Sequence, residues 1–419
     1  MKFAPELLKL AEKAEVELKE IFDEIDKTEF INLGRVMDAF TEFKVADAMF
    51  DSTSGYGYDD RGRDTLDQIW ARVMGAEAAL VRHNIVSGTH ALTIGLFGLL
   101  RPNDIMFSIA GKPYDTLEEV IGIVGEAGNG SLRDFGVEYM QADLVDGGFD
   151  FEAIEKVLCE NRGRVKVVFI QKSKGYLNRK TLTSKEIGEV VKLVKSISPD
   201  TFIVVDNCYG EFVEREEPTM LGADLIIGSL IKNPGGGMAE SGGYFAGSKK
   251  AIELVSYRLT SPGVGGEVGA TLGQNKSLYK GLFYAPHTVA QAIKTAHFAA
   301  YVFENLGFKV EPKATERRAD IIQTVITEDP EKLCAFCRGI QAGSPVNAYV
   351  TPVPWAMPGY TDEVIMAAGT FTQGASIELS ADGPLRAPYT AFFQGGLTYQ
   401  SGKLGILSAA EAMIDAGLL

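Results

Sequence analysis

The feature that most constrains this chain is a regular alternation of short apolar runs with amphipathic segments, which begins near residue 78. The runs include "RVKVVFIQ", "TFIVVDN" and "ADLIIGSL", and they are rich in β-branched residues. Apolar strands that alternate with helices are typical of a parallel sheet with both faces covered. We therefore predict an α/β domain with doubly wound character.

The rest of the chain divides around this domain. Apolar residues at three- and four-residue spacing in "LLKLAEKAEVELKEIF" predict an N-terminal helical segment over residues 1–50. The α/β domain is expected over residues 51–288. A long helix from near His287 leads into mixed strands and helices, so we predict a smaller α+β domain over residues 289–419.

Composition limits the partners and the location of the protein. The chain has 41 lysines and arginines against 56 acidic residues, a net charge of −15, which argues against nucleic acid or an anionic membrane as a partner. The N-terminus lacks the pattern of a secretory signal, and no window approaches the roughly 18 apolar residues of a membrane span. We expect a cytoplasmic protein. The single "CAFC" pair favours structural packing over a zinc site.

Polar residues follow the predicted strands, at the edge where open α/β sheets bind ligands. They are Ser87, Gly88 and Thr89 after residues 78–84, Tyr114 after 104–110, Gln171 and Ser173 after 164–170, Asp206 after 202–205, and Ser229 and Lys232 at the end of 224–230. Five strands therefore bring side chains to one shared rim.

The chemistry of this rim is consistent with one cofactor. Residues 87–89 open a helix, whose N-terminus suits a phosphate, and Tyr114 offers an aromatic face to a flat ring. Asp206 is a strand-end carboxylate that needs a cationic partner. Lys232 is an amine whose pKa partial burial is expected to lower, which would make it nucleophilic. A phosphate, a flat ring, a cationic ring nitrogen and an aldehyde describe pyridoxal 5'-phosphate.

Each of these residues alone has a simpler structural explanation. Residues 87–89 suit a plain helix cap, Asp206 an ion pair, Tyr114 ordinary packing, and Lys232 a side chain that reaches solvent. Their combination and order favour the cofactor. The glycines of "KNPGGG" also raise the possibility of a nucleotide-phosphate site, but they follow the lysine, whereas in a P-loop they precede it.

Four motifs carry a resemblance to a known family: "YGYDDRGRDTLDQIWARVMGAEAALVRHNIVSGTHAL", "VVDNCYGEF", "GADLIIGSLIKNPGGG" and "SIELSADGPLRAPYTAFFQGGLTY". With these, nearly the whole chain resembles the fold-type I (aspartate aminotransferase-like) enzymes that depend on pyridoxal phosphate. It is most similar to the cystathionine and methionine gamma-lyase superfamily, in the branch of aluminium resistance proteins.

The resemblance implies a role for each residue. Lys232 would form the Schiff base with the cofactor and carry protons, Asp206 would pair with the ring nitrogen, and Tyr114 would stack on the ring. The remaining cofactor contacts that it implies are Ser87, Gly88, Thr89, Ser173, Tyr209 and Ser229. Tyr58 and Arg61 would reach the phosphate bound to a neighbouring subunit. Tyr56 and Arg63, in the same "YGYDDRGR" segment, are the other residues that the segment offers for this role. Arg386 or Arg258 would bind the substrate carboxylate.

The implied activity is a carbon–sulfur lyase acting on a sulfur amino acid such as cystathionine, cysteine or methionine, by β- or γ-elimination. Tyr114 is the candidate acid for the leaving group. The family implies a homo-oligomer, a tetramer built as a dimer of dimers with shared sites. Two alternatives stay open: a transferase or aminotransferase on the same fold, and a non-catalytic metal-stress protein, although no carboxylate cluster has metal-ligand spacing.

Overall fold

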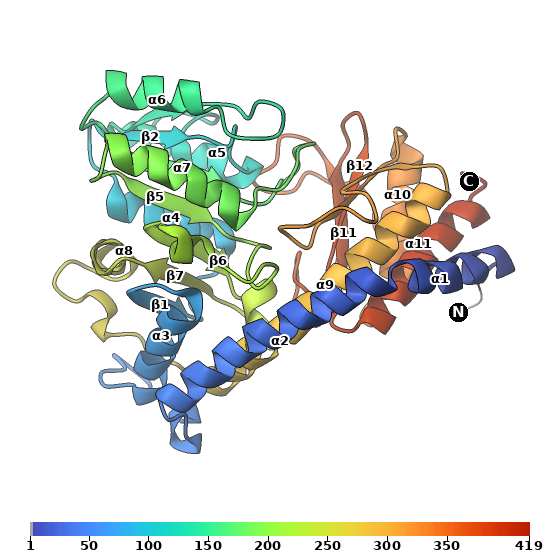
Figure 1. Cartoon of the computed structure of the whole chain (residues 1–419), viewed down its shortest axis with the longest axis horizontal. Coiled ribbons are helices and arrows are strands. Elements are labelled where there is room, and N and C mark those ends of the chain that lie inside the picture. The colour runs from blue at the N-terminus through green and yellow to red at the C-terminus, as the bar shows by residue number, and fades with distance from the viewer. Residues whose placement is uncertain (1–2) are drawn as a thin grey trace.

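The computed structural model describes residues 3–419, which form two sheets connected by one long helix (Figure 1). Two N-terminal helices, α1 (Pro5–Glu17) and α2 (Lys19–Glu42), meet at Leu18. Helix α2 lies along α9 (Asn275–Asn305), and α1 reaches the far end of the molecule near α11 (Tyr399–Asp415). The N-terminal segment therefore connects the two sheets from the outside.

The larger sheet has seven strands in the order β1-β7-β6-β5-β4-β2-β3. The strands are β1 (Ala78–Arg82), β2 (Ile105–Ser108), β3 (Glu138–Gln141), β4 (Val165–Gln171), β5 (Phe202–Asp206), β6 (Leu225–Ser229) and β7 (Gly243–Gly247). Only β7 runs antiparallel to its neighbours. The predicted α/β class with a mostly parallel sheet is confirmed, while β3 and β7 were not predicted.

Helices cover both faces of this sheet, which explains its uninterrupted apolar strands. In β4, Val168 and Ile170 pack into one buried cluster while Val167 and Phe169 pack into another on the opposite face. The first face is covered by α3 (Arg61–Met74), α6 (Phe151–Glu160) and α7 (Ser184–Ile197); the second is covered by α4 (Gly88–Leu99), α5 (Asp115–Ile121) and α8 (Lys249–Leu259). Successive side chains of a strand point to opposite faces, so both must be apolar.

The smaller sheet has five antiparallel strands in the order β10-β11-β12-β9-β8. They are β8 (Lys309–Glu311), β9 (Gln323–Ile326), β10 (Val364–Ala367), β11 (Ser380–Pro384) and β12 (Thr390–Gln394). This sheet packs with α10 (Pro330–Ala342), α11 and the second half of α9 in a separate buried cluster. Short 3-10 turns occur at Asp47–Phe50, Arg133–Phe135, Pro218–Leu221, Asn233–Gly235 and Gly265–Glu267.

Helix α9 is longer than the sequence indicated. We expected it from near His287, but it begins at Asn275 and continues through Pro286. A proline lacks the N–H that would continue the helical hydrogen bonds, which is why the pattern suggested a start there. The expected boundary between residues 288 and 289 falls inside this helix. Of the helices described over residues 3–419, none combines the length and apolar character needed to span a bilayer.

Candidate active site

The N-terminus of α4 forms a small cradle at the carboxyl end of the larger sheet. Ser87 caps the helix by accepting a hydrogen bond from the His90 N–H at 3.0 Å, and the Thr89 hydroxyl is 2.6 Å from that of Thr116. Within residues 3–419, the backbone N–H groups of Gly88 and Thr89 have no acceptor. Two free donors at a helix N-terminus are a suitable site for a phosphate.

Gly88 brings the cradle close to two other strand ends. A Cβ atom added to Gly88 would lie 3.3 Å from Cys208 Sγ and 3.6 Å from Ser229 Cβ. Cys208 follows β5 and Ser229 ends β6, so the ends of these strands meet at the cradle. Gly88, Cys208 and Ser229 therefore meet here, at three of the five strand ends of the predicted rim, and the hydroxyls of Ser87 and Thr89 already form hydrogen bonds within the chain.

Lys232 lies three residues beyond β6 and faces an aromatic ring. Its Nζ atom is 4.0 Å from the centre of the Tyr209 ring. Tyr209 has a φ of 69°, a left-handed conformation that is uncommon outside glycine, and its hydroxyl donates to the Ala375 carbonyl at 3.3 Å. The backbone and the hydroxyl together hold the ring against the lysine amine.

The expected direction of the Lys232 pKa shift is wrong for this structure. Burial does act to lower the pKa, but the neighbouring Cys208, Tyr209 and Asp206 outweigh it, so the pKa is raised. Burial also raises the pKa values of Cys208 and Tyr209. Both groups are therefore neutral near pH 7, and the Asp206 carboxylate is the third neighbour that raises the pKa of the lysine.

Asp206 ends β5 as a buried carboxylate with few partners. Its Oδ1 accepts the Cys208 N–H at 3.1 Å, and no ion pair to it within 4.0 Å occurs in the described part of the chain. Burial raises its pKa, and the charge of Lys232 opposes this shift. On the adjacent strand, Gln171 pairs in register with Asp206. Gln171 Oε1 and the Ser173 hydroxyl are buried and unpartnered, which marks a place for a polar ligand.

We call residues 87–89, Asp206, Ser229 and Lys232 the strand-end group. Their chemistry fits pyridoxal phosphate. The cradle offers free N–H donors, Asp206 offers an unpaired carboxylate, and Lys232 offers an amine beside an aromatic ring. Unpartnered buried polar atoms occur at Gln171, which ends the adjacent strand β4, and at Ser173, two residues beyond it.

A second group of side chains comes mainly from loops and from the smaller sheet. The Tyr114 hydroxyl, at the start of α5, is 2.9 Å from that of Tyr360. The Tyr176 ring lies 5.5 Å from Tyr114, and its hydroxyl donates to Asp382 on β11. We call these four residues the tyrosine–carboxylate group. Of them only Tyr114 was predicted, although Asp382 lies within the "SIELSADGPL" motif.

The three glycines after Lys232 serve close packing. A Cβ on Gly235 would lie 1.6 Å from the Leu230 carbonyl oxygen, and one on Gly236 would lie 2.4 Å from that of Gly281 in α9. A Cβ on Gly237 would lie 2.3 Å from a methyl carbon of Leu397. Only glycine allows these approaches. The glycines thus have a packing role that needs no nucleotide.

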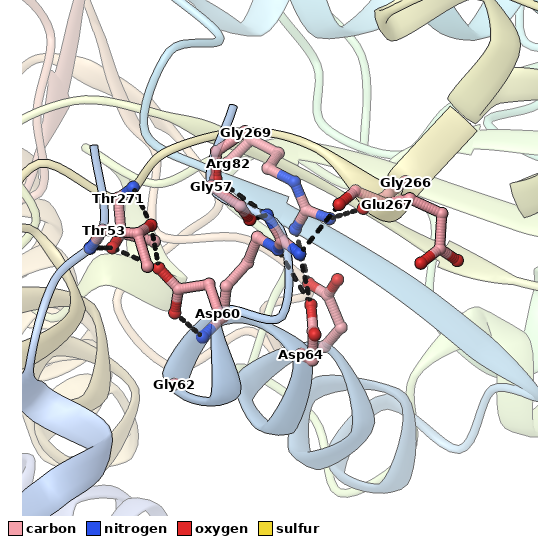
Figure 2. Close-up of polar contacts among 12 residues, drawn as sticks. Thr53, Gly57, Asp60, Gly62, Asp64, Arg82, Gly266, Glu267, Gly269 and Thr271 are labelled. Carbon is pink, nitrogen blue, oxygen red and sulfur yellow. Dashed lines mark hydrogen bonds and ion pairs between the residues drawn. The ribbon is translucent and has the colours of Figure 1, made fainter. Parts of the chain in front are cut away.

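The "YGYDDRGR" segment is held by hydrogen bonds at some residues, while other side chains of the segment are exposed to solvent. Figure 2 shows the hydrogen bonds that tie it to residues 266–271. Arg63 is buried and donates to the carbonyls of Gly57 and Gly269 at 2.7 and 2.9 Å. Arg61 is exposed, and Tyr58 is 61% exposed. Of the two arginines, Arg63 therefore has a structural role within the chain, whereas Arg61 and Tyr58 are accessible to another molecule.

The two arginines suggested for the substrate carboxylate lie in different places. Arg386 pairs with Asp362 at 2.9 Å and with Asp115 at 3.7 Å, beside Tyr114. Arg258 lies over the ring of Phe97, 5.0 Å from its centre. Because Phe97 is nine residues from Gly88 along α4, Arg258 sits about 13 Å along the helix from the cradle. Of these two arginines, Arg386 is the one that lies beside Tyr114.

Comparison with known proteins identifies the family. Residues 7–414 match the family model described as methionine gamma-lyase. The Bacillus subtilis protein YnbB is 51% identical over 414 residues, which cover 99% of this chain and 98% of its own. A crystal structure of a carbon–sulfur lyase involved in aluminum resistance from Clostridium novyi is 49% identical, with a TM-score of 0.94 over 98% of this chain and 96% of that one.

A more distant structure supports the fold. The pyridoxal-5'-phosphate dependent protein YhfS from Escherichia coli has a TM-score of 0.60 at 17% identity, covering 94% of this chain and 97% of its own. The predicted fold type I and the predicted resemblance, including the aluminium resistance branch, are confirmed. The chain belongs to the methionine gamma-lyase family.

Proposed function

We propose that this protein is a carbon–sulfur lyase that uses pyridoxal phosphate to act on a sulfur-containing amino acid. One observation carries the proposal: the Lys232 amine lies 4.0 Å from the centre of the ring of Tyr209, three residues beyond the buried Asp206. The free N–H groups at residues 88–89 and family membership support it. In this proposal Lys232 holds the cofactor as a Schiff base.

Each residue of the strand-end group has a distinct task. Pyridoxal phosphate, when bound, supplies an electron sink that makes the substrate α-proton acidic. The Lys232 amine, in its neutral form, would take up that proton and return it. Asp206 would pair with the protonated ring nitrogen of the cofactor, and the N–H groups of Gly88 and Thr89 would hold its phosphate. Ser229 lies beside Gly88 in the cradle, and Ser173 offers an unpartnered hydroxyl to the cofactor.

The remaining assignments concern the substrate and the assembly. Tyr114, whose hydroxyl is hydrogen-bonded to that of Tyr360, donates a proton to the departing sulfur. Arg386, which lies beside Tyr114, binds the substrate carboxylate. Tyr58 and Arg61, exposed on the anchored segment, complete the site of a partner subunit in a homo-oligomer, which we propose to be a tetramer. The products are a thiol, ammonia and a 2-oxo acid.

The test is a spectrum followed by an assay. Purified protein supplied with pyridoxal phosphate should show a visible absorbance band that borohydride bleaches, and Lys232→Ala should lack it. The wild type should then form pyruvate or 2-oxobutyrate from sulfur amino acids without an added acceptor. A protein that does not bind the cofactor contradicts the proposal. Product formation only with a 2-oxo acid acceptor would instead identify an aminotransferase.

A further inference from the structure

Asp206 and Lys232 are held in place in different ways. Asp206 ends β5 and pairs in register with Gln171 of β4 and with Ile227 of β6, so the sheet fixes its position. Lys232 lies three residues beyond the end of β6, where the strand pairing does not reach. Among residues 3–419, no ion pair within 4.0 Å joins the two side chains. Other contacts must therefore set the position of Lys232 relative to Asp206.

The residue that follows each of these two side chains is a buried asparagine. Asn207 and Asn233 are both 0% exposed. The Asn207 side-chain amide donates to Glu217 Oε2 at 3.0 Å. The Asn233 side-chain amide donates to the main-chain carbonyl oxygen of Glu211 at 2.9 Å. Both asparagines are thereby tied to one short segment, residues 211–217.

The Tyr244 hydroxyl on β7 joins the two asparagine contacts. It donates to Glu211 Oε1 at 2.8 Å and accepts from the Asn207 amide at 3.4 Å. The Glu211 side chain lies against the backbone of β6, because a Cβ atom added to Gly228 would be 2.4 Å from Glu211 Oε1. Gly228 in turn pairs in register with Tyr244. One network of hydrogen bonds therefore connects the two asparagines.

This network contains buried atoms without partners, which lowers its value for stability alone. Glu211 Oε2 and the side-chain oxygens of Asn207 and Asn233 are buried and have no partner within residues 3–419. Such atoms lose their hydration and gain no hydrogen bond in return. Burial raises the pKa of Glu211 to about 8, so its side chain is mostly neutral near pH 7. A network of this kind, next to both side chains in the chain, indicates a role in positioning.

We propose that Tyr244 and Glu211 form a positioning pair, which couples the carboxyl end of β5 to the turn after β6. The first of these carries Asp206, and the second carries Lys232. Both members act through the two asparagines rather than on the substrate itself. The expected effect on turnover rests on the proposed lyase function, whereas the coupling is a property of the chain with or without the cofactor.

Tyr244→Phe tests the pair, because it removes one hydroxyl and keeps the ring whose centre lies 5.3 Å from that of Trp70. Hydrogen exchange followed by mass spectrometry should show residues 207–212 and 230–236 exchanging at least about tenfold faster than in the wild type, since the loss of a buried hydrogen bond makes local opening easier. With pyridoxal phosphate and a sulfur amino acid, kcat should fall about 10–100-fold while KM changes less than about threefold.

Two further variants control this experiment. Thr201→Val removes another buried hydroxyl, which donates to the Val165 carbonyl at 2.6 Å next to the opposite end of β5. It should leave both kcat and the exchange of the two segments unchanged. Glu211→Gln keeps an acceptor for the Tyr244 hydroxyl and replaces an acid that is mostly neutral near pH 7, so it should behave like the wild type.

The other outcomes would overturn the proposal. Faster exchange in only one of the two segments, or equally throughout the chain, excludes the coupling. A Tyr244→Phe enzyme with kcat within about threefold of the wild type excludes the positioning role, as does a Thr201→Val variant with the same defects. Defects in Glu211→Gln would assign the effect to a charge and contradict the proposal. If exchange changes as expected but the wild type forms no 2-oxo acid from sulfur amino acids, the lyase function fails and the coupling stands.

Discussion

The strand-end group and the tyrosine–carboxylate group meet around Lys232, yet they are built in different ways. The first lies on the ends of parallel strands and at one helix N-terminus, where backbone hydrogen bonds fix each position. The second brings together two loops, the start of α5 and β11 of the smaller sheet. The first group thus suits fixed binding of a cofactor. The positions of the second group depend on how the smaller sheet packs against the larger one. Such an arrangement suits the recognition of variable substrates.

The largest difference between the groups should appear at Lys232. Lys232→Ala removes the only amine of the strand-end group, so 2-oxo acid formation should fall roughly 10⁴-fold or more. Lys250→Ala, which changes an exposed lysine on α8, is the control and should be unaffected. Residual activity within tenfold of the wild type would mean that the chemistry lies elsewhere.

Asp206 and Asp382 provide the most direct comparison of two buried carboxylates. Asp206→Asn should lower activity about 10²–10³-fold on every sulfur substrate, because it removes a preorganised charge. It should also weaken retention of pyridoxal phosphate in equilibrium dialysis. Asp382→Asn should leave cofactor retention unchanged. Equal cofactor loss in both variants would show that the division into two groups is wrong.

The glycines beside Lys232 test whether the strand-end group is held by close packing. Gly235→Ala places a Cβ atom against the Leu230 carbonyl oxygen and should lower the free energy of unfolding in urea by about 3 kcal/mol. Gly34→Ala lies in α2, where a Cβ meets no atom within 4 Å, and should be neutral or slightly stabilising. A Gly235→Ala variant as stable as the wild type would reopen a ligand-binding role for the glycines.

The pH dependence of stability should separate the tyrosine–carboxylate group from the rest. The folded-state pKa of Asp382 is raised to about 6, so protonation stabilises the native state at low pH and this contribution is lost as pH rises towards the folded pKa. Relative to Asp382→Asn, the free energy of unfolding of the wild type should fall by about 3 kcal/mol between about pH 4 and pH 7. Other titrating groups cancel in this difference, and a flat difference curve would contradict the raised pKa.

The same division explains what the sequence could predict. Lys232, Asp206 and Gly88 follow apolar strands or open a helix, so a parallel sheet alone brings them to one edge. Tyr176, Tyr360 and Asp382 meet only because the smaller sheet packs against loops of the larger one, and no local pattern encodes that arrangement. The strand β7 was missed because "GYFAG" is short and rich in glycine. The direction of the Lys232 pKa shift was missed because the prediction considered burial alone and left out the charge of Asp206, which the same sheet edge brings near.

The smallest expected effect concerns Arg386 and Arg258, and it tests which of them contributes to substrate binding. Arg386 is 37% exposed in its side chain and already pairs with Asp362 and Asp115, so its charge is partly neutralised. Arg386→Ala should therefore raise KM about tenfold at most, with kcat nearly unchanged. Arg258→Ala should change neither constant, because that side chain packs on Phe97 away from the cradle. If Arg258→Ala instead raised KM, the guanidinium of Arg258 would have to act in the site of a partner subunit. The substrate-binding residues would then come from two chains, as proposed for the cofactor contacts of Tyr58 and Arg61.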